Sequence, residues 1–107
     1  MLGNLGSLYS IQAPGSVHFY AEAEKIYRRK LALEERLFGE SNIRVSATLE
    51  SLGEALYGES AYNEARQTFG RGLALQEATL GQSDPRTQAA SKRYHVLVKK
   101  MRADAVK

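Results

Sequence analysis

Tyr20-Ala21-Glu22-Ala23 recurs 42 residues later in the chain (62 − 20 = 42) as Tyr62-Asn63-Glu64-Ala65, and the match continues without a gap to Gly39 and Gly81. Further equivalent pairs are Tyr27 and Phe69, Arg29 and Arg71, Leu31 and Leu73, Leu33 and Leu75, and Glu35 and Glu77. A fixed period of this size is typical of stacked supersecondary units, each of which is too small to bury its own apolar face. We therefore expect a repeat architecture.

Helical periodicity and turn signals divide the chain into five expected helices. Their ranges are about 2–12, 17–38, 43–57, 61–80 and 85–103. The first is ended by Ala13-Pro14-Gly15-Ser16, a strong helix breaker. Gly39 and Gly81 stand where a glycine commonly follows the last turn of a helix, and Pro85 suits a first helical position. No stretch alternates like a strand, so the predicted fold class is all-α.

The five helices are expected to form two antiparallel hairpins and a closing helix, within a single domain over residues 1–107. The expected ranges are about 2–39 and 42–81 for the hairpins and about 84–103 for the capping helix. Gly53, and Gly6 in the first hairpin, should lie where two helices cross closely. His95 takes the aligned position of the last helix (53 + 42 = 95). A large residue there favours a closing helix, because no partner helix follows it.

Two features depart from a regular repeat. Gly70 and Gly72 lie inside an expected helix, where each glycine costs about 1 kcal/mol relative to alanine. A close approach of the 85–103 helix would explain Gly72, while the sequence offers no reason for Gly70. The turn around Gln12–His18 is five residues longer than that of the second hairpin. This turn is either a tolerated surface insertion or a loop that touches a partner.

The run Leu52-Gly53-Glu54-Ala55-Leu56-Tyr57, followed by Tyr62, Ala65 and Phe69, resembles the tetratricopeptide repeat. The period and the link Leu80-Gly81-Gln82-Ser83-Asp84-Pro85 are similar to the subtype of kinesin light chains and nephrocystin-3-like proteins. The resemblance implies antiparallel helix hairpins stacked as a right-handed superhelix, a solenoid. It also implies a concave groove lined by the first helix of each hairpin, where a partner would bind.

The resemblance assigns a set of partner-binding residues to this groove. They are Ser7, Glu50, Glu54, Tyr57, Lys92, Val96, Lys99 and Lys100. The expected function is a non-enzymatic protein–protein interaction scaffold that binds a peptide or helix of another protein. Motor cargo binding, ciliary assembly and signalling adaptors are all compatible with it.

The residues predict neither catalysis nor a cofactor. The chain has no cysteine, which excludes disulfides, thiolate metal sites and cysteine nucleophiles. His18 and His95 are the only histidines, and no histidine or carboxylate cluster has the ligand spacing of zinc. Glu34 and Glu35 are adjacent and point to different parts of a helix surface. No glycine or serine motif matches a phosphate loop or a nucleophile elbow. We expect no enzyme, no cofactor and no metal.

The net charge of +3 is unevenly distributed. Residues 92–107 contain six basic residues and one acidic residue, a balance of +5, which leaves −2 for the other 91 residues. This segment is either a solvated terminal helix or a basic surface for an acidic partner, nucleic acid or a membrane surface, with nucleic acid disfavoured. A third alternative is self-association through the open first helix, where Leu2, Leu5 and Leu8 would be exposed.

The apolar runs are too short for a transmembrane segment, and the N-terminus lacks the features of a signal peptide. We therefore expect a cytoplasmic protein, either one compact domain or a short part of a longer array.

Overall fold

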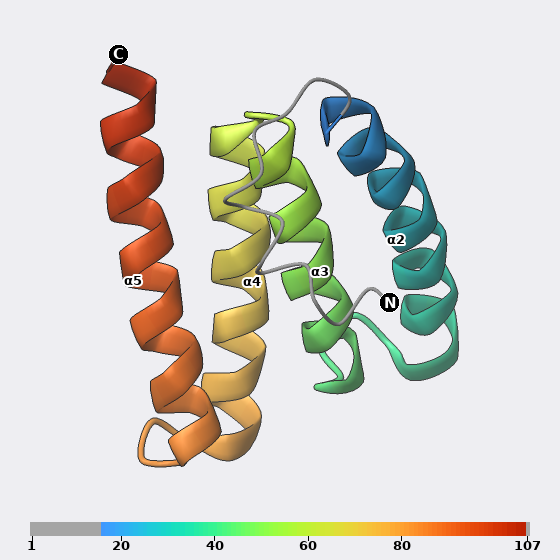
Figure 1. Cartoon of the computed structure of the whole chain (residues 1–107). Coiled ribbons are helices and arrows are strands. Elements are labelled where there is room, and N and C mark those ends of the chain that lie inside the picture. Colours follow the sequence, from blue (N-terminus) through green and yellow to red (C-terminus); the bar gives the residue numbers. More distant parts are fainter. Residues whose placement is uncertain (1–15, 107) are drawn as a thin grey trace.

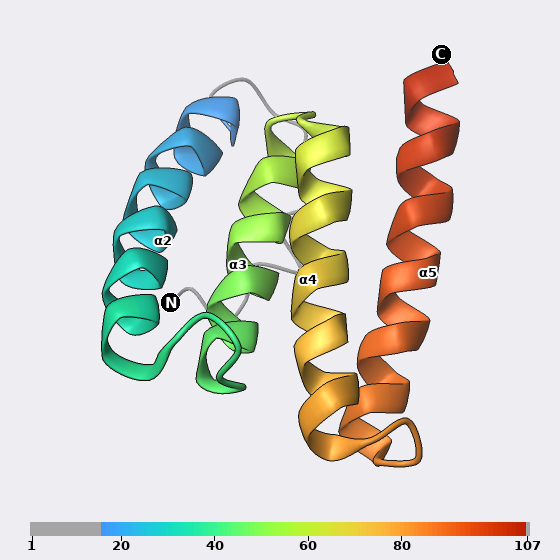
Figure 2. The same cartoon turned by 180° about the vertical axis from the view of Figure 1, so that it is seen from behind.

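The computed structural model describes residues 16–106 and places four α-helices in them (Figures 1 and 2). They are α2 (Ser16–Phe38), α3 (Arg44–Gly58), α4 (Tyr62–Leu80) and α5 (Pro85–Val106). Helix is the only regular secondary structure in this range, so the all-α prediction is confirmed for these residues. The expected bounds hold to within one residue, except that α5 continues past 103 to Val106. The described residues thus hold four helices, not five, and the one predicted over 2–12 lies outside them.

The helices stand in space in the order in which they occur along the chain. Figures 1 and 2 show α2 at one edge, α3 and α4 in the middle and α5 at the other edge, with consecutive helices antiparallel. Accordingly, α3 packs on both α2 and α4, whereas α5 packs on α4. Each of the two edge helices therefore has a side that no other described helix covers.

The repeat predicts the positions that form the core. Ala23 and Ala65 are buried as an equivalent pair, and so are Tyr27 and Phe69. Such burial stabilises a fold by about 1.5–3 kcal/mol for each large side chain. The remaining members of the core cluster are Tyr20, Leu52, Ala55, Leu56, Tyr57, Leu97 and Met101. The 42-residue period is therefore the period of the residues that hold neighbouring helices together.

Glycines on α3 and α4 mark the close approaches of the helices. A Cβ atom at Gly53 would lie 3.0 Å from three ring atoms of Phe69, so α3 and α4 cross closely at the predicted place. A Cβ atom at Gly72 would lie 3.5 Å from Cβ of Leu49 on α3. The prediction that α5 approaches Gly72 is therefore wrong. The α5 residue Tyr94 instead lies over Gly70, which accounts for a glycine that the sequence left unexplained.

A third close approach joins α2 to α3. Gly58 is the last residue of α3, and a Cβ atom there would lie 2.3 Å from the ring of Tyr20. That ring is 1% exposed and is enclosed by the core. Gly58 therefore provides the space in which Tyr20 of α2 packs, a role that its place in the turn Gly58-Glu59-Ser60 did not predict.

We expect Gly58→Ala to lower the free energy of unfolding by about 1–3 kcal/mol, because the added methyl group overlaps a buried ring. Gly70→Ala is the matched control, because its methyl group would meet Tyr94 at an ordinary contact distance of 3.5 Å. Alanine favours a helix by about 1 kcal/mol over glycine, so this control should keep or raise stability. Urea unfolding of both variants measures the difference, and equal destabilisation would contradict the assignment.

Candidate functional site

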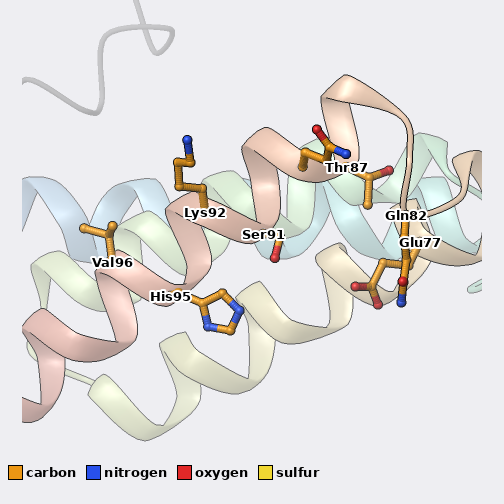
Figure 3. Close-up of a pocket in the computed structure, with 8 residues that line it drawn as sticks. Glu77, Gln82, Thr87, Ser91, Lys92, His95 and Val96 are labelled. Carbon is orange, nitrogen blue, oxygen red and sulfur yellow. The ribbon is translucent and has the colours of Figure 1, made fainter.

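The largest of the pockets described here lies where the end of α4 meets α5, and we call it the α5 pocket (Figure 3). Its volume is about 590 Å³, within the range of about 300–1,000 Å³ typical of ligand sites. Its lining residues are Glu77, Gln82, Thr87, Gln88, Ser91, Lys92, His95 and Val96. In Figure 3, Glu77 and Gln82 lie beside the N-terminal end of α5, and the other labelled side chains follow along that helix.

The lining combines one apolar side chain with charges of both signs. Val96 is 59% exposed, so its apolar side chain is open to solvent within this pocket. Lys92 is exposed and positive, while Glu77 is half-buried and negative. Thr87 is buried, and its hydroxyl group donates a weak 3.5 Å hydrogen bond to the carbonyl oxygen of Gln76. The pocket can therefore hold an apolar group flanked by polar or charged groups.

A second pocket, of about 340 Å³, is lined by Glu50, Gln76, Arg86, Ala89, Ala90 and Arg93. The Glu50 carboxylate on α3 accepts hydrogen bonds from the Arg93 guanidinium on α5 and, at 3.3 Å, from the Gln76 amide on α4. Glu50 thus connects three helices, and its charge is balanced by Arg93. An exposed ion pair of this kind contributes about 0–1 kcal/mol, so its main effect is on the position of α5.

The structure separates the predicted partner-binding residues. Lys92 and Val96 line the α5 pocket together, whereas Glu50 lines the second pocket. Lys99 and Lys100 are exposed on α5 but line neither of these pockets. Ser7 lies outside the described residues.

The other two predicted residues face inward or partly inward. Tyr57 is 6% exposed and belongs to the core cluster, where its ring lies 5.6 Å from that of Tyr62 between centroids. Glu54 is half-buried. The pKa of Tyr20 is raised mainly by the burial of Tyr20 and, to a smaller extent, by the charge of Glu54. Both residues thus act within the helix packing, and neither presents its whole side chain to an open surface.

Sequence reasoning did not assign His95, Ser91 and Glu77 to the site. The alignment of His95 with Gly53 concerns the size of the side chain alone, which does not reveal that His95 is exposed on α5. A helical spacing would have found it, because Ser91 and His95 are four residues apart and lie next to Lys92 and Val96. Glu77 reaches the pocket from another helix, which spacing along α5 does not reveal.

An acidic cluster joins α2 to the turn between α3 and α4. Arg28 donates to Glu24 at 2.5 Å and to Glu64 at 2.6 Å. Glu59 lies against Glu24, and its Oε2 atom is buried without a partner other than that carboxyl group. Burial and the hydrogen bond with Glu24 raise the pKa of Glu59 to about 7. The same hydrogen bond, aided by Arg28, lowers the pKa of Glu24.

No family model, curated protein or solved structure matches this chain. Within residues 16–106, His, Asp and Glu side chains do not gather in groups of three or more that could hold a metal ion. None of the helices in the described part of the chain has the length and apolar character needed to cross a membrane.

The raised pKa of Glu59 makes stability depend on pH. The folded state holds a proton on Glu59 up to about pH 7, whereas the unfolded carboxyl group releases it near 4.5. The free energy of unfolding should therefore fall as the pH rises through this window, because the folded state binds more protons than the unfolded state. Glu59→Gln keeps a hydrogen-bond donor toward Glu24 and should flatten the dependence. Urea unfolding across this pH range measures it.

Glu40→Gln is the control, because Glu40 is an exposed carboxylate in the connection between α2 and α3. This variant should keep the slope of the unmodified chain. An unchanged slope in Glu59→Gln would show that Glu59 titrates normally.

Proposed function

We propose that this chain is a non-enzymatic interaction scaffold that binds an extended or helical segment of a partner protein. The observation that carries the proposal is the α5 pocket, in which Val96 is 59% exposed within a hollow of about 590 Å³. An exposed apolar side chain can receive an apolar anchor of the partner, and the surrounding charges then select its neighbours. Lys92 favours an acidic neighbour, and Glu77 favours a basic one.

We further propose that the helices belong to a right-handed solenoid of the tetratricopeptide type. The burial of repeat-equivalent residues and the antiparallel order of neighbouring helices support this proposal. In such a stack, α3 and α5 would line the concave side, and the contact between Glu50 and Arg93 joins these two helices. The groove would then be basic near Lys99 and Lys100, while the charge of Glu50 in its middle is balanced by Arg93.

The proposal is tested with peptides selected by display against the full chain. For a peptide with an apolar residue next to acidic residues, Val96→Asp and Lys92→Glu should each weaken binding at least about tenfold, equivalent to 1.4 kcal/mol. The first variant removes the apolar contact and the second introduces repulsion. Isothermal titration calorimetry measures the dissociation constants.

Two matched controls lie on α2, at the other edge of the structure. Leu37→Asp changes an apolar side chain that is 65% exposed, and Arg36→Glu reverses an exposed charge. Both variants should bind the peptide as the unmodified chain does. Equal affinities for all four variants would remove the α5 pocket from the proposed function. Binding only to polyanions, lost in salt, would favour the basic-surface alternative.

A further inference from the structure

A third pocket lies between the beginning of α4 and the C-terminal half of α5, and we call it the arginine pocket. Its volume is about 150 Å³, and its lining residues are Tyr62, Asn63, Arg66, Val98, Met101 and Arg102. Arg66 and Arg102 are exposed, and neither has an ion-pair or hydrogen-bond partner among the described residues. The pocket therefore presents two positive charges that the described part of the chain does not balance.

The beginning of α4 adds to this positive field. Tyr62 and Asn63 are the first two residues of α4, and the N-cap residue Ala61 forms no side-chain hydrogen bond with the first turn. The N-terminus of a helix carries a partial positive charge, which favours anions nearby. The one carboxylate of this turn, Glu64, is paired with Arg28 of α2 at 2.6 Å. The arginine pocket is thus suited to an anionic group.

The first unit of the repeat shows which anionic group fits at this place. With the 42-residue offset, Arg66 corresponds to Glu24 of α2 (66 − 24 = 42). Likewise, Met101 corresponds to Glu59, which follows the last residue of α3 (101 − 59 = 42). In the first unit, the Glu59 carboxyl group lies against Glu24, with its Oε2 atom buried. The second unit has no acidic residue in the lining of the arginine pocket, so the equivalent place is open to a carboxylate from outside the chain.

The arginine pocket and the α5 pocket lie along the same seam between α4 and α5, which stand side by side in Figures 1 and 2. On α5, Ser91 of the α5 pocket and Arg102 of the arginine pocket are eleven residues apart (102 − 91 = 11). On α4, Arg66 and Glu77 have the same separation (77 − 66 = 11). Eleven residues make about three helical turns, so each pair lies on one side of its helix, about 16 Å apart. One bound segment can therefore reach both pockets.

We propose that the partner segment whose apolar anchor enters the α5 pocket also places an aspartate or glutamate side chain in the arginine pocket, an inference that rests on the proposed function. The carboxylate accepts hydrogen bonds from Arg66 and Arg102, because a guanidinium group matches a carboxylate in both shape and charge. The acidic residue lies about five positions from the anchor in an extended segment and about eleven positions from it in a helical one.

Parallel display selections from one random peptide library test the proposal. The targets are the unmodified full chain and the chain with both Arg66→Gln and Arg102→Gln. The first pool should combine an apolar residue with an acidic residue at one of the two spacings, while the second should keep the apolar residue and lose the acidic preference. Deep sequencing compares the pools. Both arginines are exposed, so the variant should unfold at the same urea concentration as the unmodified chain.

A double-mutant cycle on one selected peptide measures the contact itself. Arg66→Gln and Arg102→Gln should each weaken binding at least about fivefold, because each removes a charged hydrogen bond to the carboxylate. Neither substitution should affect a version of the peptide in which the acidic residue is replaced by its amide. Arg29→Gln is the matched control, since Arg29 is an exposed arginine of α2 and its loss changes the net charge equally. Isothermal titration calorimetry gives the dissociation constants.

The outcomes separate the arginine pocket from the proposed function. An acidic preference that survives in the second pool would overturn the arginine pocket, and so would an equal loss of affinity in Arg29→Gln. In both cases, peptide binding that Val96→Asp weakens would still support the proposed function. Selected peptides whose binding does not depend on Val96 would overturn both. Binding of a single-stranded oligonucleotide in preference to every peptide, lost with Arg66 and Arg102, would assign the arginines to phosphate groups and overturn the carboxylate.

Discussion

The packing of an aromatic ring onto a glycine is the contact on which the helix arrangement depends. It occurs on both sides of α3, where Phe69 of α4 lies over Gly53 and Tyr20 of α2 lies over Gly58. Nine of the 15 residues of α3 are buried, as expected for a helix that is covered on more than one side. Since neither glycine leaves room for a side chain, both rings have a fixed place. The positions of α2 and α4 relative to α3 follow from these two contacts.

This constraint also explains where the open surfaces lie. The buried residues of α5 are Thr87, Leu97 and Met101, on the part of this helix that packs on α4. The opposite side of α5 has no neighbour among the described helices, so Val96 and Lys92 remain exposed there. The candidate site thus exists because α5 stands at the edge of the row of described helices. Packing on α4 holds α5 in place, and side chains of α5 beside that contact line the pocket together with Glu77 of α4.

The sequence predicted the helices of residues 16–106 and several of their buried positions directly. Its repeat identified buried pairs such as Tyr27 and Phe69, because core packing restricts these residue types most strongly. Glycines within the predicted helix 61–80 also indicated close helix contacts, but the sequence did not show which neighbouring helix approaches each glycine. Gly70 and Gly72 are two residues apart, about 200° around a helix, so they face different helices. Tyr57 lies four residues after Gly53, so both residues face the same side of α3. Because Gly53 lies at the contact with α4, this spacing explains why Tyr57 is buried.

The two edges of the stack differ in chemistry, and this difference suggests different kinds of contact. The α2 edge presents several large apolar side chains, such as Ile26 and Leu33, which resembles the surface of a permanent interface. The α5 edge presents Val96 among charged groups, and such surfaces suit partners that bind and leave. Charges also discriminate between partners, whereas exposed apolar side chains accept any apolar cover. The apolar edge at α2 therefore suits a permanent contact and, under the proposed function, the charged edge at α5 suits a reversible one.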